Sequence, residues 1–365
     1  MTARLSQLTA SARRLALVGL AKNTGKTVAL AALLRELEAE GRRVGVTSVG
    51  RDGEERDVID SRIEKPRVRL SGGSLVATTD GLLRSSGLPH ELLQETGIRT
   101  PLGRVLIARL RGPGTIEVAG PSAAAAVRAV SDAMLGYGAE QVLIDGAVDR
   151  RAASSPDVAD GLVMATGAVL GKDIADVVLQ TSDAVDLARL PVVDEDSQIG
   201  QRLRALADTA TGEARSVLVN ENEDHDPVAL PPRFVLAADA TQIAELLDAN
   251  PTARWLIVSG ALPDAFLGDL VHAARRRREL TVVVADSTKV FLWKRGPGWY
   301  RDQGVQIEVL KAIELEALTV NPVAPQSHRF DSIELRELLG EAIADVPIFD
   351  VLHPDYQGAA QPARP

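Results

Sequence analysis

The 365-residue chain contains no cysteine. Disulfide bonds, thiolate metal sites and cysteine nucleophiles are therefore excluded. The five histidines are scattered through the sequence and show no spacing typical of a histidine-ligated metal site. A glycine-flanked serine of the hydrolase type and a motif of paired catalytic carboxylates are also missing. The chemistry of this chain must therefore come from other residue types.

Long apolar runs are missing as well. The sequence holds no uninterrupted apolar segment of about 18 residues, and residues 1–14 contain no run of signal-peptide type. We therefore expect neither a membrane span nor a signal peptide, and we predict a cytoplasmic protein. The net charge of −9 argues against nucleic acid as a partner. Hydrophobic residues make up 45% and charged residues 25%, which is a globular balance, and the length suits two or three domains.

The most informative stretch runs from Leu15 to Gly41. Leu15 to Gly19 form a short apolar segment that predicts a buried strand. Leu20 to Thr27 follow with turn formers and end in Gly-Lys-Thr. Leucines then recur at helical spacing, and Gly41 fits the end of the helix. This order of strand, glycine-containing loop and helix is typical of the phosphate-binding loop of nucleotide-binding proteins.

Each residue type in the loop suits a phosphate chain. Gly25 lets the backbone approach, the Lys26 ammonium can reach the outer phosphates, and the Thr27 hydroxyl can bind Mg²⁺. The alternative is an ordinary turn with a solvated lysine. Lysine is scarce, however, with seven against 34 arginines, and two of the seven lie in this loop. We predict that the nucleotide is bound by Gly19, Lys22, Asn23, Thr24, Gly25, Lys26 and Thr27.

A second informative stretch, Gln141 to Gly146, is an apolar run that ends in Asp145. Such a strand carries a carboxylate to the edge of the sheet, where it can meet Mg²⁺ beside Thr27. The charged loop 50–57 offers further carboxylates. Asp52 is the best candidate among them for orienting water or holding Mg²⁺. The alternative is that this loop is a solvated turn. We expect catalytic roles for Lys26, Asp52 and Asp145, and metal ligation by Thr27, Asp52 and Asp145.

The loop is one residue longer than the usual pattern, because the glycine lies six residues before Gly25, at Gly19. In this it resembles dethiobiotin synthetase and its relatives, a branch of P-loop proteins that includes the MinD/ParA ATPases and nitrogenase iron protein. The resemblance covers about the first 180 residues. It implies phosphate binding by Gly25 and Lys26, and Mg²⁺ ligation by Thr27 and Asp145. Where dethiobiotin synthetase has Glu-Gly-Ala-Gly-Gly, this chain has Asp145-Gly146-Ala147-Val148-Asp149.

A longer resemblance spans most of the chain. It is similar to proteins that accompany the cobalamin-dependent lysine 5,6-aminomutase and are thought to reactivate it. The motifs that carry this resemblance are Gly19–Thr27, Thr47–Glu54, Ile144–Ala147 and Thr319–Pro322. The resemblance implies a client enzyme as partner.

For the fold we predict an α/β protein with a three-layer P-loop NTPase sheet and a second α/β domain. The polar stretch 220–227 suggests the boundary, giving a nucleotide-binding domain at 1–225, a second domain at 226–350 and a tail at 351–365. Among the less regular segments, the patterns predict a helix over 82–95 and strands over 174–179 and 233–237.

The predicted function is an ATPase that uses Mg²⁺ and acts as a chaperone or reactivating factor for a metabolic enzyme. An ATP-dependent ligase or small-molecule kinase, and a scaffold that senses nucleotide without hydrolysing it, are the alternatives. ATP is favoured because the guanine-reading Asn/Thr-Lys-x-Asp motif is missing. Asn220 and Asn321, each near a strand end, are candidates for reading adenine, although turn asparagines are common. We expect nucleotide and a client enzyme as partners, allow for a homodimer, and expect neither nucleic acid nor membrane.

Overall fold

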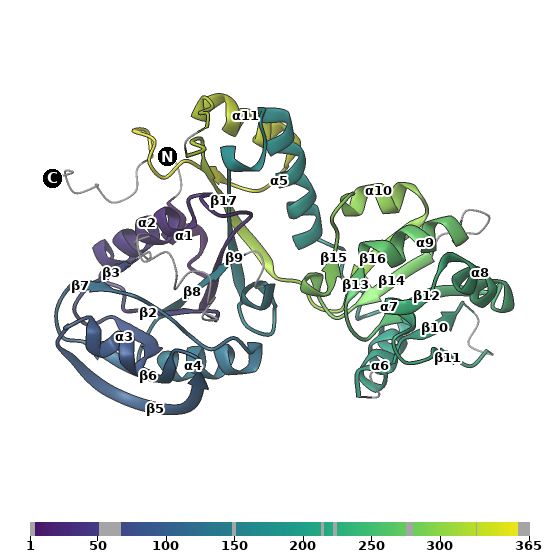
Figure 1. The fold of residues 1–365 in the computed structure, drawn as a ribbon, viewed down its shortest axis with the longest axis horizontal. Helices are drawn as coiled ribbons and strands as arrows, with labels where there is room; N and C mark the ends of the chain where they lie inside the picture. Colours follow the sequence, from purple (N-terminus) through teal and green to yellow (C-terminus); the bar gives the residue numbers. More distant parts are fainter. Residues whose placement is uncertain are drawn as a thin grey trace. The chain divides into compact units, whose positions relative to one another are not determined.

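The computed structural model describes residues 4–50, 67–147, 151–212, 215–221, 225–274, 280–325 and 327–356. The chain forms two compact units (Figure 1). Unit 1 comprises Met1–Ser182 and Ile313–Pro365, and unit 2 comprises Asp183–Ala312. Unit 2 is therefore inserted between two segments of unit 1. No helix in the described ranges is long and apolar enough to span a membrane.

Unit 1 is built on a nine-stranded sheet in the order β18-β17-β9-β1-β8-β2-β4-β6-β5. The strands from β18 to β4 run parallel, and β6 and β5 complete the sheet in antiparallel fashion. The strands are β1 (Arg14–Gly19), β2 (Val44–Ser48), β4 (Leu75–Thr79), β5 (His90–Thr100), β6 (Gly103–Leu110), β8 (Gln141–Ala147), β9 (Gly161–Gly167), β17 (Glu314–Asn321) and β18 (Ile348–Phe349).

Consecutive residues are buried along β2, β4 and β9, so both faces of the central sheet are covered, as in α/β proteins. The helices of unit 1 are α1 (Leu5–Leu8), α2 (Lys26–Ala39), α3 (Asp80–Ser85), α4 (Ala124–Gly136), α5 (Ile174–Ala188), which continues into unit 2, and α11 (Ser332–Ala342). Short 3₁₀ turns are η1 (Arg151–Ser154) and η2 (Ala168–Leu170), and β3 (Val68–Leu70) pairs with β7 (Gly114–Ile116) in a small sheet.

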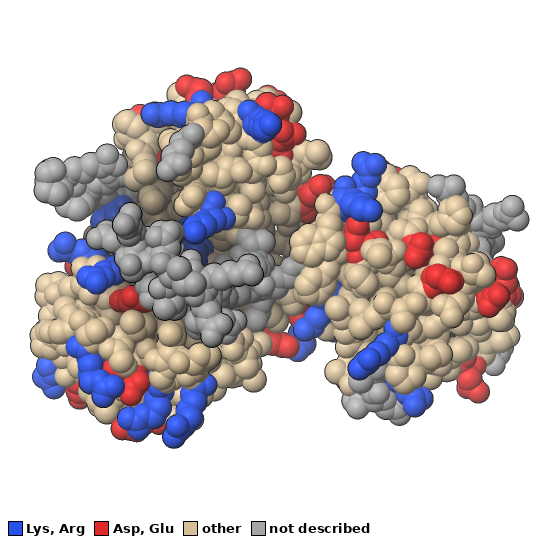
Figure 2. Space-filling model, in the orientation of Figure 1, with Lys and Arg blue, Asp and Glu red and all other residues tan. Residues whose placement is uncertain are grey.

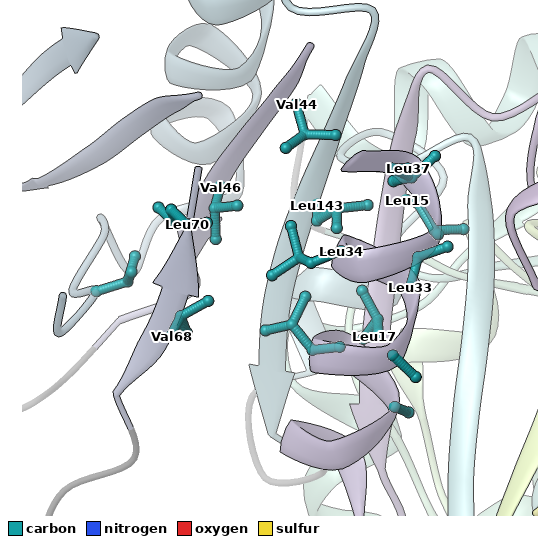
Figure 3. Close-up of a cluster of buried hydrophobic side chains, with 14 of the residues drawn as sticks. Leu15, Leu17, Leu33, Leu34, Leu37, Val44, Val46, Val68, Leu70 and Leu143 are labelled. Atoms are coloured by element: carbon teal, nitrogen blue, oxygen red, sulfur yellow. The ribbon is translucent and has the colours of Figure 1, made fainter. Parts of the chain in front are cut away.

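Helix α2 is fixed by its leucines. Leu30, Leu33 and Leu37 are at most 1% exposed, and they recur at the spacing of one helix face. Figure 3 shows side chains of this helix beside Leu15 and Leu17 of β1, together with residues of β2, β3 and β8. The start of α2 is therefore held firmly at the end of β1.

Unit 2 is a second α/β unit. Its five-stranded sheet has the order β11-β10-β12-β14-β16, in which β12, β14 and β16 are parallel. The strands are β10 (Val217–Asn220), β11 (Val228–Ala229), β12 (Ala253–Val258), β14 (Leu280–Val284) and β16 (Val305–Val309), and β13 (Leu262–Pro263) pairs with β15 (Val290–Phe291). The helices are α6 (Gln198–Gly212), α7 (Phe234–Ala237), α8 (Ala240–Ala249), α9 (Asp264–Ala274) and α10 (Pro297–Asp302), with the short turn η3 (Ser287–Lys289).

The α/β class and the second α/β unit agree with the sequence, but the bounds of the units do not. The predicted boundary at 225 falls between β10 and β11, which pair with each other in one sheet. The predicted second domain also included β17, which instead pairs with β9 in the sheet of unit 1. Polar composition marks a loop, but it does not tell whether the strands on either side pair.

Three predicted elements are different in the structure. The predicted helix 82–95 is α3 followed by β5, because Gly87, with φ +65°, and Pro89 separate them. The predicted strand 174–179 is the first part of α5, where the Asp173 carboxylate accepts the Asp176 N–H. The predicted strand 233–237 is α7. In the first two segments, turn and cap chemistry outweighed the local apolar pattern.

Candidate functional site

The candidate site begins where β1 ends and α2 starts. Asn23 and Gly25 have φ angles of 69° and 88°, in the left-handed region, whereas Lys26 opens the right-handed helix. Only three described non-glycine residues have positive φ, and Asn23 is one of them. A left-handed residue next to a right-handed one, as Gly25 is next to Lys26, turns neighbouring N–H groups toward one concave side, which is an arrangement suited to anions. The helix has no side-chain cap and no acidic residue in its first turn.

Gly19 gives the longer loop its shape. A Cβ on Gly19 would lie 2.6 Å from the Thr24 Oγ1 atom. Thr24 is 2% exposed, and its hydroxyl donates to the Ala21 carbonyl at 3.0 Å. The Leu20 N–H donates to the Ala165 carbonyl of β9. Gly19 and Thr24, which we expected to contact nucleotide, thus have a clear packing role inside the loop.

Lys26 and Asp145, both of which the sequence predicted as catalytic residues, form an ion pair. The distance from Lys26 Nζ to Asp145 Oδ1 is 2.5 Å, with side-chain exposures of 20% and 27%. The Oδ1 atom itself is covered and makes no well-aligned hydrogen bond, so the contact is mainly electrostatic. Strand β8 supplies Asp145 in register with Leu17 of β1, and the Val49 N–H donates to the Asp145 carbonyl. The Lys26 ammonium therefore lies in the right place to exchange a carboxylate for a phosphate.

Asn321 at the end of β17 contacts the loop directly, which we did not predict. Its Nδ2 group donates to the Asn23 carbonyl at 2.8 Å, and its Oδ1 atom accepts the Val323 N–H at 3.1 Å. A Cβ on Gly25 would lie 3.1 Å from the Asn321 Cβ. Both ends of this amide are therefore engaged within the protein, where it holds the loop. Pro322 after a strand end was the available signal, but the sequence could not show which loop the strand would reach.

Asn220, the other candidate for reading adenine, belongs to unit 2. It is 3% exposed, and its Oδ1 atom accepts the Thr252 hydroxyl at 3.0 Å. This amide oxygen therefore serves the packing of β10 against the start of β12.

Three predicted site residues remain: Thr27 and Lys22, which the structure describes, and Asp52, which it does not. Thr27 is half-buried in the first turn of α2, and Lys22 is exposed. Asp52 and the rest of 51–57 lie outside the described residues. The described part of the chain contains no group of three or more acidic or histidine side chains that could hold a metal ion. Thr27 and Asp145 nevertheless fit Mg²⁺, which takes hard oxygen ligands and is commonly held by one or two carboxylates together with substrate phosphates.

The end of β2, beside Asp145, is fixed by hydrogen bonds of Ser48. The Ser48 hydroxyl accepts the Gly120 N–H at 3.0 Å and donates to the Val118 carbonyl at 3.2 Å. A Cβ on Gly120 would lie 2.0 Å from the Ser48 carbonyl oxygen, so only glycine fits there. The strand that leads into the 50–57 loop is thereby fixed close to Asp145, with which Ser48 is in register.

Comparisons with known proteins add no assignment: no protein-family model, curated protein or solved structure matches this chain. The interpretation of the site therefore depends on its own geometry and chemistry.

Proposed function

We propose that this chain binds ATP with Mg²⁺ at the loop 19–27 and hydrolyses it. The observation that carries the proposal is the uncapped start of α2, with left-handed Asn23 and Gly25 before it and Lys26 paired to a carboxylate from the neighbouring strand. An ordinary strand-to-helix turn needs neither two left-handed residues nor a lysine held at the first helical position. A polyphosphate uses both.

Each residue has a role in this proposal. The loop N–H groups and the Lys26 ammonium bind the phosphates and stabilise the charge that develops on the transferred phosphoryl group. Thr27 and Asp145 would hold Mg²⁺, which neutralises phosphate charge when bound. Release of Lys26 from Asp145 accompanies nucleotide binding, because both partners find new counter-charges. A carboxylate of the 50–57 loop, with Asp52 the first candidate, orients the attacking water.

The second part of the proposal concerns the use of hydrolysis. Unit 2 is joined to unit 1 by two segments: α5, which follows β9 and η2, and the segment that leads into β17, whose last residue, Asn321, contacts the loop. A change at the loop can therefore reach unit 2 through its own connections. Together with the motif resemblance, this supports a factor that reactivates a client enzyme, with a cobalamin-dependent aminomutase as the client to test first.

The test is Mg²⁺-dependent turnover of ATP by the full chain, with analysis of the products. We expect slow release of inorganic phosphate, lowered about 100-fold or more in Lys26→Ala because a transition-state cation is lost. Lys294→Ala is the matched control, since Lys294 is an exposed lysine of unit 2. Turnover that requires a small co-substrate indicates a ligase or kinase, and stimulation by a protein client indicates a reactivating factor. Binding without turnover would contradict the hydrolase proposal and leave a nucleotide sensor.

A further inference from the structure

A small cavity lies at the amino ends of strands β2 and β4 in unit 1, whereas the phosphate loop lies at the carboxyl end of β1. It has a volume of about 150 Å³. Its walls come from the end of α2 and the start of β2 on one side, and from the end of β3 and the turn before β4 on the other. Because β1, β2 and β4 belong to one parallel series, the amino ends of β2 and β4 lie away from the loop that follows β1. Helix α2, about 21 Å long, separates the two places.

Three arginines line this cavity: Arg42, Arg43 and Arg69. Arg42 is half-buried, and neither its guanidinium nor that of Arg69 forms an ion pair or hydrogen bond with any described residue. The Arg43 guanidinium lies 3.9 Å from the Glu140 carboxylate, which also accepts the Arg43 backbone N–H at 3.1 Å. Glu38 is the single carboxylate among the described lining residues. Figure 2 shows basic side chains over the side of unit 1 where Figure 1 places β3 and β7. The cavity is thus locally basic in a chain whose net charge is −9.

The turn before β4, which forms part of the cavity wall, is tight and presents small polar groups. Ser71 and Ser74 flank Gly72 and Gly73, and the Ser74 N–H donates to the Ser71 carbonyl at 3.2 Å. Gly73 has a φ of +92°, and no atom lies within 4 Å of a Cβ placed on it. Neither serine hydroxyl bonds to a residue in the described ranges, although Ser74 is only 6% exposed. The turn therefore adds open space and two serine hydroxyl groups to the lining of a cavity that arginines also line.

We propose that this cavity binds a phosphoryl group, either as inorganic phosphate or as the phosphate end of a small monoester. Arginine forks match phosphate oxygens in pairs, and hydroxyls can complete the set. The general attraction of basic residues to the carboxyl end of a helix accounts for Arg42 and Arg43 but not for Arg69, which comes from β3. It also does not account for the open turn or the unused serine hydroxyls. The proposal does not depend on nucleotide binding at the loop.

The experiment uses the full chain with Lys26→Ala as background, so that phosphate bound at the loop does not contribute. Inorganic phosphate, glycerol phosphate and acetate are titrated while amide NMR signals are followed. We expect both phosphates, but not acetate, to shift the signals of Gly72, Gly73 and Ser74. The affinity for phosphate should fall about tenfold or more in Arg42→Gln/Arg69→Gln, since two charge-assisted contacts are removed.

The control is Arg84→Gln/Arg104→Gln, which removes the same charge from arginines that pair with Asp80 elsewhere in unit 1. Its phosphate affinity should stay within about twofold of the background, because exposed charges act weakly at a distance in salt. Equal weakening in both double variants, or no shift at residues 72–74, would overturn the proposal. Thermal unfolding confirms that each variant is folded, and Ser74→Ala is a milder variant that should weaken phosphate binding without loss of charge. A stronger response to glycerol phosphate than to inorganic phosphate identifies a monoester as the ligand.

Discussion

Helices α8 and α9 of unit 2 begin differently from helix α2 of unit 1. In unit 2, the Asp239 carboxylate accepts the Gln242 N–H at the start of α8 at 2.9 Å. Helix α9 begins with Asp264, a buried carboxylate that accepts the Tyr300 hydroxyl at 2.5 Å. In unit 1, helix α2 has no acidic residue and no side-chain cap at its start, and it begins with Lys26. The chain therefore supplies its own negative charge at the starts of α8 and α9 and leaves that place open in α2.

This difference separates a structural helix start from one available to a ligand. Free N–H groups at a helix start require an acceptor, from a side chain, water or a bound anion. Substitutions around the start of α2 should therefore change nucleotide binding, whereas substitutions at the capped helix starts of unit 2 should change only stability.

Apart from the loss of Lys26 itself, the largest effect is expected for Gly25→Ala. A side chain at φ +88° is strained, and its Cβ would press on Asn321 at 3.1 Å, so the loop would turn its N–H groups away from the phosphates. We expect ATP affinity to fall about tenfold to 100-fold, measured by calorimetry. Gly260→Ala, after β12 of unit 2, is the control because nothing lies within 4 Å and its φ is not positive. Unchanged ATP affinity in Gly25→Ala would contradict the assigned loop geometry.

Next in size is Asn321→Ala, which removes the bond to the Asn23 carbonyl. We expect ATP affinity to fall about tenfold, because the loop loses the side chain that fixes its left-handed residue. Asn220→Ala is the matched control in unit 2: it should lower the free energy of unfolding by about 1–2 kcal/mol without changing ATP affinity. Equal effects of the two variants on ATP affinity would show that Asn321 has no special connection with the loop.

A smaller effect is expected for Asp239→Ala. Loss of this cap should lower the free energy of unfolding by about 1 kcal/mol, seen as a lower thermal midpoint for unit 2. ATP affinity should not change. Loss of ATP binding in this variant would mean that the two helix starts are not functionally distinct.

The smallest effect concerns Asp183, where α5 packs against Gly296 in unit 2. Burial, with a contribution from Asp186, raises the pKa of Asp183 above 3.8. The folded state therefore keeps its proton to higher pH than the unfolded state does, so stability declines as pH rises from about 3.8 through the raised pKa. Asp183→Asn should remove this loss and raise the thermal midpoint at neutral pH by about one or two degrees. A gain that persists unchanged at pH 3 would contradict this cause.

The sequence predicted the parts of the site that are local. Strand β1, the loop and α2 are contiguous, and their apolar spacing and glycines were sufficient to place Lys26 at the helix start. Asp145 was predicted because a strand that ends in a carboxylate brings it to the same edge of a parallel sheet, and the ion pair agrees with this.

The sequence could not predict what depends on pairing between distant segments. Asn321 reaches the loop only because β17, after an inserted unit of 130 residues, returns to pair with β9. Because β17 belongs to unit 1, the predicted domain boundary at residue 225 is wrong. Nor could local patterns distinguish β5 from a helix, because its alternation is interrupted by two register shifts in its pairing with β6.

The most direct test of the central claim is equilibrium binding of Mg²⁺ and ATP to the full chain, measured by calorimetry for the wild type and Lys26→Ala. We predict saturable binding by the wild type that is lost or strongly weakened in the variant, while Lys294→Ala binds like the wild type. No binding by the wild type, or equal binding by all three proteins, would contradict the account. Gly25, Lys26 and Thr27 would then form only a structural turn.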